Sequence, residues 1–198
     1  MKYIYYLIFL FSTSINADNY HLAGSATYNE YNDIFKQFFP SKINVWAIQK
    51  NEFQEIVIQF ENSLGDDPQW RYKFDRCSNK DIKKNRCQES GYKANEKFSR
   101  LKQSLLKSIE WSETALNNEV ERFSKDIILE NKERGVGKFF YNGSKQTDLI
   151  ISVNFYPFGF KDLYINLIDQ MLLLTILEEE IDNAFSKSKD SKVDELFN

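Results

Sequence analysis

Residues 53–75 read FQEIVIQFENSLGDDPQWRYKFD, and the fold class predicted from this sequence rests on their pattern. Apolar residues stand at every second position in two runs, which are Ile56, Ile58 and Phe60, and then Trp70, Tyr72 and Phe74. Such alternation is typical of a strand with one buried face. A turn is expected between the runs at 65–68, where the residues are Gly-Asp-Asp-Pro. The stretch therefore predicts two antiparallel strands, although the spacing of 53–64 also fits a helix.

Further strands are expected on either side of this stretch. Residues 43–49 are predicted to precede it as a strand, followed by a turn at 50–52. Residues 139–141 and 149–156 are predicted to form a hairpin around Asn142-Gly143, because Asn-Gly favours the positive φ angles of a tight turn. The predicted fold is α+β: an antiparallel sheet of about five strands, packed with two long helices and one short N-terminal helix.

Three segments carry apolar residues at helical spacing. Residues 27–38 open with Thr-Tyr-Asn-Glu, which resembles a capping box, and their aromatic residues are expected in the core. Those aromatic residues are Tyr28, Tyr31, Phe35 and Phe38. Residues 93–134 follow the eleven-residue rhythm of a nearly straight helix, with Asn117-Asn118 as the expected break. Residues 162–186 are apolar on most sides, which predicts a central helix or a homodimer interface.

The N-terminal residues have the pattern of a secretory signal. Lys2 precedes an apolar run at 3–11, and small residues lead to an expected cleavage after Ala17. The run is too short to cross a bilayer, which takes about 20 apolar residues. The predicted parts are a cleaved signal at 1–17, a single domain at 18–186 and a frayed polar tail at 187–198. We therefore expect a periplasmic or extracellular protein with no transmembrane segment after signal removal.

The two cysteines of the chain lie in residues 76–90, RCSNKDIKKNRCQES. Thiols of exported proteins usually pair, so we expect a disulfide between Cys77 and Cys87. A metal site would need more ligands, usually with Cys-x-x-Cys pairs, and the one histidine is His21. Closing this short loop contributes roughly 3 kcal/mol in the chain-entropy model.

The charge of the chain is unevenly distributed. The net charge is −3, which argues against a nucleic-acid partner, yet residues 71–107 hold twelve Lys or Arg and four Asp or Glu. Five of these cations surround the cysteines: Arg76, Lys80, Lys83, Lys84 and Arg86. They are expected to contact a protein with an acidic surface or cleft, since a closed loop loses little entropy on binding. An anionic envelope polymer and an anionic membrane surface are the other candidate partners. The alternative is a solvated polar loop without a partner.

The sequence contains no recognisable catalytic motif, and we expect no cofactor and no metal. Asp66-Asp67 before a proline is typical of a turn, while Asp162 and Asp169 suggest a helix cap and a buried polar residue. We therefore expect a binding protein rather than an enzyme, in its concrete form an inhibitor or immunity-type protein that blocks a toxin or hydrolase. The alternatives are a carrier of an apolar ligand and a hydrolase that uses paired carboxylates.

Overall fold

The computed structural model describes residues 20–32, 34–61, 67–118, 121–129, 136–141, 147–155 and 159–187. The predicted signal at 1–17, the Asn142-Gly143 turn and Asp66 lie outside the described residues, as does the predicted tail from 188 onward.

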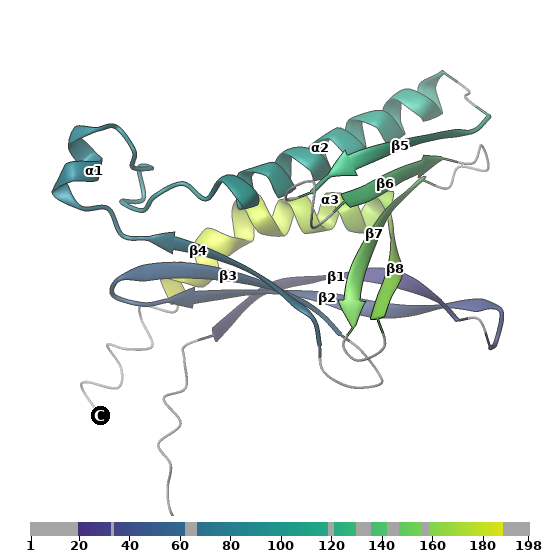
Figure 1. The fold of residues 1–198 in the computed structure, drawn as a ribbon, viewed down its shortest axis with the longest axis horizontal. Helices are drawn as coiled ribbons and strands as arrows, with labels where there is room; N and C mark the ends of the chain where they lie inside the picture. Colours follow the sequence, from purple (N-terminus) through teal and green to yellow (C-terminus); the bar gives the residue numbers. More distant parts are fainter. Residues whose placement is uncertain are drawn as a thin grey trace, which may run out of the picture.

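Eight antiparallel strands form one sheet in the order β4-β3-β2-β1-β8-β7-β6-β5 (Figure 1). The strands are β1 (Tyr20–Asn32), β2 (Gln37–Gln49), β3 (Phe53–Phe60), β4 (Gln69–Asp75), β5 (Phe123–Ile128), β6 (Val136–Tyr141), β7 (Thr147–Phe155) and β8 (Gly159–Asn166). The helices are α1 (Asn79–Lys83), α2 (Glu96–Asn117) and α3 (Leu167–Thr175), followed by a π-helical turn, η1 (Ile176–Glu180), and more helix at 181–187. The sheet thus consists of two four-stranded meanders, with α1 and α2 in the connection between them.

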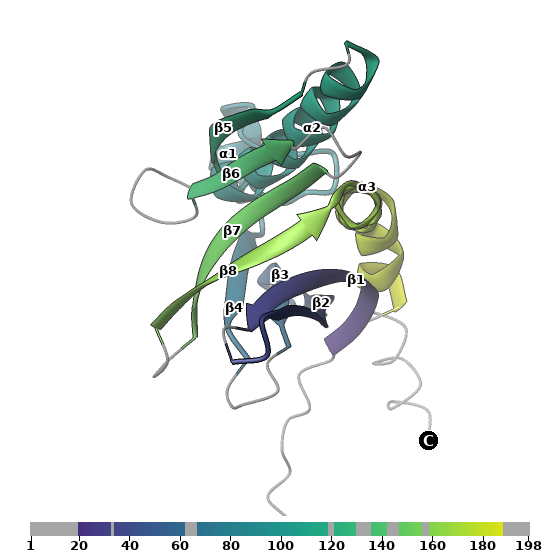
Figure 2. The same ribbon diagram turned by 90° about the vertical axis from the view of Figure 1, so that its right-hand side faces the viewer.

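The two meanders meet at a short junction. Strands β1 and β8 pair through two residue pairs, Asn29 with Tyr164 and Glu30 with Leu163. Beyond these pairs the strands diverge, and α3 lies across the resulting gap (Figure 2). On the α3 side, the backbone N–H of Thr27 donates to the carboxylate of Asp169 at 2.8 Å. The helix therefore closes the sheet where strand pairing does not.

The core lies between the curved sheet and the helices. Inward-facing side chains of both meanders meet the buried faces of α2 and α3, and the largest fully buried ones include Tyr28, Tyr72, Phe60, Phe139 and Phe155. Helix α2 is amphipathic: Phe98, Leu101, Leu105 and Ile109 are buried while its other side faces solvent. Burying one such side chain contributes about 1.5–3 kcal/mol, so the two meanders are held together mainly by this shared core.

Several local predictions are confirmed. Residues 43–49 lie in β2, the following runs form β3 and β4, and β6 pairs with β7 as the expected hairpin. Helix α2 ends at Asn117 and is capped by Asn118, at the expected break.

The predicted number of strands and the predicted positions of the helices are wrong, because all three predicted helical segments contain strands. The sheet has eight strands rather than about five. The described residues of 27–38 form no helix: they belong to β1, β2 and the turn between them, with Tyr28 in the core. In this turn, Asn32 Oδ1 accepts the backbone N–H groups of Ile34 and Phe35, at 2.9 and 3.1 Å, and so reverses the chain.

The two predicted long helices are each shorter than expected. The segment 93–134 is helical only to Asn117, and β5 then returns as an edge strand paired with β6. The segment 162–186 begins within β8, and helix α3 starts only after Asn166, whose side chain caps it by accepting from the N–H of Asp169 at 3.0 Å. Within these two segments, β5 and the end of β8 form strands rather than helix because they pair with strands elsewhere in the sheet. The local periodicity of a sequence does not report such pairing.

Candidate functional site

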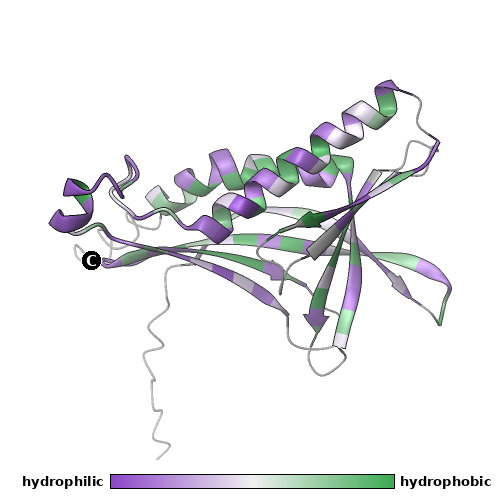
Figure 3. Ribbon diagram, turned by 45° about the horizontal axis from the view of Figure 1, so that its top comes forward, coloured by the Kyte–Doolittle hydropathy of each residue, from purple (hydrophilic) through white to green (hydrophobic). Residues whose placement is uncertain are grey.

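The segment between β4 and α2, residues 76–93, forms a lobe at one end of the molecule, which we call the basic lobe (Figure 1). The predicted disulfide is confirmed: Cys77 and Cys87 are bonded, with Cα atoms 6.1 Å apart. The lobe contains the short helix α1, and all five predicted partner-binding cations are exposed on it. These are Arg76, Lys80, Lys83, Lys84 and Arg86. Figure 3 shows the hydrophilic colouring of α1.

Backbone hydrogen bonds fix the base of the basic lobe to the sheet. The N–H of Cys77 donates to the carbonyl of Gly91 and that of Lys93 to the carbonyl of Asp75, both at 2.9 Å. Tyr92 is buried, and its hydroxyl accepts from Nε2 of the buried Gln49 at 2.9 Å. The cations are therefore carried on a short segment that is tied at both ends.

The interior of the lobe is ordered by Asp81. The N–H of Asp81 donates to the hydroxyl of Ser78 at 3.3 Å, and the N–H of Ser78 donates back to the Asp81 carboxylate at 3.1 Å, a capping box. Lys93 lies 3.3 Å from the same carboxylate. The hydroxyl and the N–H of Ser78, with a smaller contribution from Lys93, lower the pKa of Asp81 from 3.8 to about 2.

This lowered pKa predicts that the lobe loosens only in strong acid. Because the pKa is lower in the folded lobe, the stabilisation is complete above 3.8 and is lost as the pH falls through about 2. Amide hydrogen exchange within α1, corrected for its intrinsic pH dependence, should accelerate between these values. The Asp81→Asn variant, which cannot titrate, should lack this step. A carboxyl of Asp81 that titrates near 3.8 in NMR would contradict the assignment.

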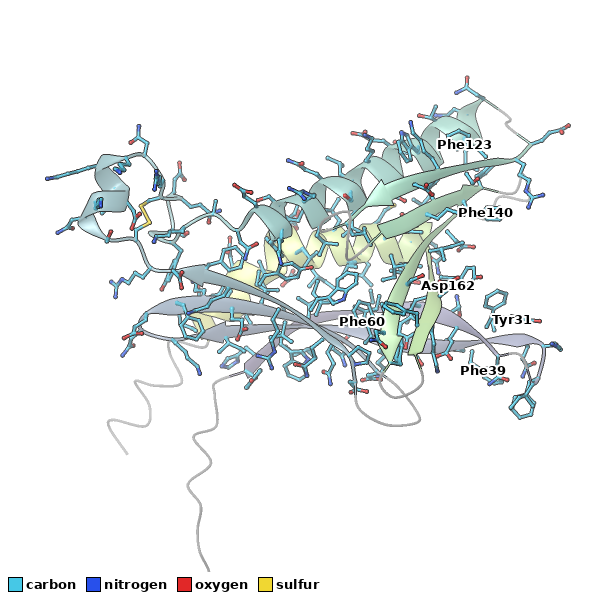
Figure 4. All side chains as sticks on the ribbon, in the orientation of Figure 1. Tyr31, Phe39, Phe60, Phe123, Phe140 and Asp162 are labelled. Carbon is cyan, nitrogen blue, oxygen red and sulfur yellow. A yellow bond between two sulfur atoms is a disulfide. The ribbon has the colours of Figure 1, made fainter. Side chains whose placement is uncertain are left out.

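A second exposed feature, not predicted from the sequence, is the tip of the β1–β2 hairpin. Five large apolar side chains are exposed there, with these exposed fractions: Tyr31 40%, Ile34 84%, Phe35 66%, Phe38 48% and Phe39 38%. Three of them, Tyr31, Phe35 and Phe38, belong to the predicted helix at 27–38 and are expected there in the core of the protein. In Figure 4, Tyr31 and Phe39 lie on the end of the hairpin that projects from the sheet. The signal that could have found this site is Asn32-Asp33, a turn sequence within the aromatic run.

The core offers little space to an apolar ligand. A cavity of about 10 Å³ is lined by core residues such as Phe60, Leu105 and Leu173. This volume holds at most one water molecule. A carrier function would therefore require the core to open, and no observation favours that alternative.

Two surface pockets bear on the hydrolase alternative. The pocket between α2 and β5 has a volume of about 440 Å³, and Asp126 is the one carboxylate among its lining residues, which otherwise include Arg100 and Lys107. The pocket beside η1 has a volume of about 220 Å³ and is lined by Glu178 and Asp182 together with apolar side chains such as Phe98. Both of these carboxylates are exposed. Asp126 is exposed as well, so neither pocket contains a buried carboxylic acid of the kind that glycoside hydrolysis uses.

The remaining sequence candidates have structural roles or stay untested. Asp169 is buried as expected, whereas Asp162 is exposed on β8 and accepts from the Ser152 hydroxyl. Asp67 accepts from Gln59 Nε2 at 2.7 Å.

The predicted homodimer remains a prediction; α3 carries exposed Ile168, at 78%, on its outer face. Across the described residues, no helix is sufficiently long and apolar to span a bilayer.

Comparison with known proteins gives no match, whether to protein-family models, to curated proteins or to solved structures. Within the described part of the chain, no three His, Cys, Asp or Glu side chains are grouped as metal ligands.

Proposed function

We propose that this chain is an exported binding protein that engages an acidic surface of another protein through the basic lobe. The observation that carries the proposal is the exposure of Arg76, Lys80, Lys83, Lys84 and Arg86 on one disulfide-closed lobe. Export rests on the predicted signal and is compatible with the disulfide.

The geometry suits recognition of carboxylates. Residues 76–93 hold six Lys or Arg and two Asp or Glu, and Asp81 already pairs with Lys93. Clustered cations speed the encounter with an acidic partner, and a segment fixed before binding loses less conformational entropy. A lobe that protrudes from the molecule is more complementary in shape to a cleft on the partner than to a flat partner surface. The concrete form of the proposal is thus an inhibitor or immunity-type protein that blocks the acidic cleft of a toxin or hydrolase.

Charge reversal within the lobe tests this function. The variant in which Lys80, Lys83, Lys84 and Arg86 become Glu should bind its partner about 100-fold more weakly, because like charges placed together cost several kcal/mol. The partner is first captured from an envelope extract of the producing cells, and its affinity is then measured by calorimetry with the isolated proteins. Affinity for the unmodified chain should fall as salt is added.

A second variant with the same change in net charge is the control. Lys42, Arg122, Lys125 and Lys138 are exposed cations outside the lobe, and their reversal to Glu should leave the affinity nearly unchanged. A third variant, with Cys77 and Cys87 replaced by Ser, should bind more weakly while circular dichroism shows the sheet intact. Equal affinities of the two charge-reversed variants, or no captured protein with any form, would show that the lobe is not a recognition site.

A further inference from the structure

The β1–β2 hairpin continues past the strand that supports it. Strand β8 pairs with β1 only as far as Glu30, whereas β1 and β2 stay paired with each other up to Asn32 and Gln37. Residues 31, 32 and 34–40 therefore belong to a two-stranded projection, and Figures 1 and 4 show this hairpin at the opposite end of the molecule from the basic lobe.

The projection is ordered although its side chains are exposed. Strand pairing reaches the turn, and Asn32 Oδ1 accepts two N–H groups within it. Lys36 has a φ of 55°, a left-handed conformation that returns the chain into β2. The rings of Tyr31 and Phe38 are in contact, with centroids 5.2 Å apart, and those of Phe35 and Phe39 are 5.9 Å apart. The apolar groups are thus presented to solvent by a defined backbone.

Apolar side chains occupy both faces of the projection and its turn. Cross-strand partners share a face, so Phe38 lies on the face of Tyr31 and Phe39 lies on the opposite face, that of Glu30. Ile34 lies in the turn and is 84% exposed. A flat protein surface covers one face of a hairpin, whereas a lipid bilayer surrounds an inserted tip on all sides. Residues 31–40 contain one Asp and one Lys, so insertion carries no net charge into the bilayer.

We propose that the β1–β2 tip is a membrane-interface anchor that inserts Ile34, Phe35 and Phe39 among the lipid headgroups and upper acyl chains. Apolar side chains such as Phe gain by burial at this depth, and Tyr31 at the base of the tip has the amphipathic ring that is favoured at the headgroup level. The binding comes from apolar burial, so it requires no anionic lipid. The basic lobe, at the other end of the molecule, remains accessible to a protein partner.

Vesicle binding tests the anchor. The full chain, purified after export with the N-terminus that the host leaves, should cosediment with vesicles of phosphatidylcholine alone, in low and high salt. Ile34→Asp should lower the partition coefficient by about tenfold or more, since the burial of an isoleucine side chain in the lipid is lost and a charge is added. The matched control is Ile168→Asp on α3, where the isoleucine is 78% exposed; it should bind as the unmodified chain does. Both variants keep the same N-terminus, so their difference reports the hairpin.

A fluorescence measurement locates the insertion independently. Phe35→Trp should show a blue-shifted emission with vesicles and quenching by brominated lipid, beyond the signal of the native tryptophans. Ile82→Trp, at an isoleucine that is 58% exposed in the basic lobe, should show neither. The proposal is overturned if the two aspartate variants bind equally, or if the unmodified chain binds no vesicle. Binding only to vesicles with phosphatidylglycerol, abolished by salt, would assign lipid contact to the basic lobe instead and also overturn it.

Discussion

Replacing Asp169 with alanine should destabilise the fold by about 2–4 kcal/mol, because its carboxylate joins α3 to the free edge of β1. The side chain is buried, and it accepts the N–H of Thr27 at 2.8 Å, the hydroxyl of Thr27 at 2.7 Å and Nδ2 of Asn166 at 2.6 Å. Hydrogen bonds to a charged group contribute about 1.5–3 kcal/mol each and are not additive. The negative charge also lies in the first turn of α3, where it is favoured.

Urea unfolding of the variant measures this effect, and Asp162→Ala is its control. Asp162 is also a carboxylate that accepts from a hydroxyl, but it is exposed on β8, so its loss should cost less than about 1 kcal/mol. In native-state hydrogen exchange, the amide of Thr27 should lose protection in Asp169→Ala and keep it in the control. Equal unfolding midpoints for the two variants would mean that the contact between α3 and β1 contributes little to stability.

The importance of Asp169 illustrates which parts of the fold were beyond sequence reasoning. Thr27 and Asp169 are 142 positions apart, and no local pattern reports that β1 meets α3. The order of the strands has the same origin, since the junction of β1 with β8 joins the first strand to the last. Alternation within a strand predicts its buried face but not its neighbour. Strands β3 and β4 were predictable because they are consecutive hairpin partners.

The wrong helices arose where two periodicities coincide. Tyr28, Phe35 and Phe38 fit helical spacing, but they belong to β1, the turn and β2. The length of the turn happens to place them at the intervals of a helix. Residues 24–29 alternate as Gly-Ser-Ala-Thr-Tyr-Asn, a strand pattern that local reading could have preferred. Ile127 fitted the rhythm of the preceding helix because its side chain, on β5, faces the same core.

The candidate sites differ in the same way. The basic lobe was predictable because a disulfide across ten positions and a cluster of cations are local properties of the chain. The turn of the β1–β2 tip had a local signal in Asn32-Asp33, but the exposure of its side chains had none, because an apolar residue in a sequence is expected to be buried. Its exposure follows from the point where β8 leaves β1, which is a property of the whole sheet.

Substituting Gly24 is expected to be the other strongly destabilising change. A Cβ on Gly24 would lie 2.8 Å from both Cγ1 and Cδ1 of Ile176, which is 3% exposed and has little room to move. Gly24 also lies where the pairing of β1 with β2 shifts register. Overpacking of this kind costs about 1–3 kcal/mol for Gly24→Ala, and more for Gly24→Val. Urea unfolding should show the loss as a lower midpoint with an unchanged slope.

A double-mutant cycle separates the steric clash from a general intolerance of this position. Ile176→Ala alone should cost about 2–5 kcal/mol through the cavity it leaves. Combined with Gly24→Ala, it removes the two clashing atoms, so the pair should be less destabilising than the sum of its parts by about 1 kcal/mol or more. Gly159→Ala is the control, because Gly159 has a φ of 83° and open space around it. Its backbone strain should add to the effect of Ile176→Ala without coupling. Additivity at Gly24 as well would mean that η1 does not pack tightly against β1 at this glycine.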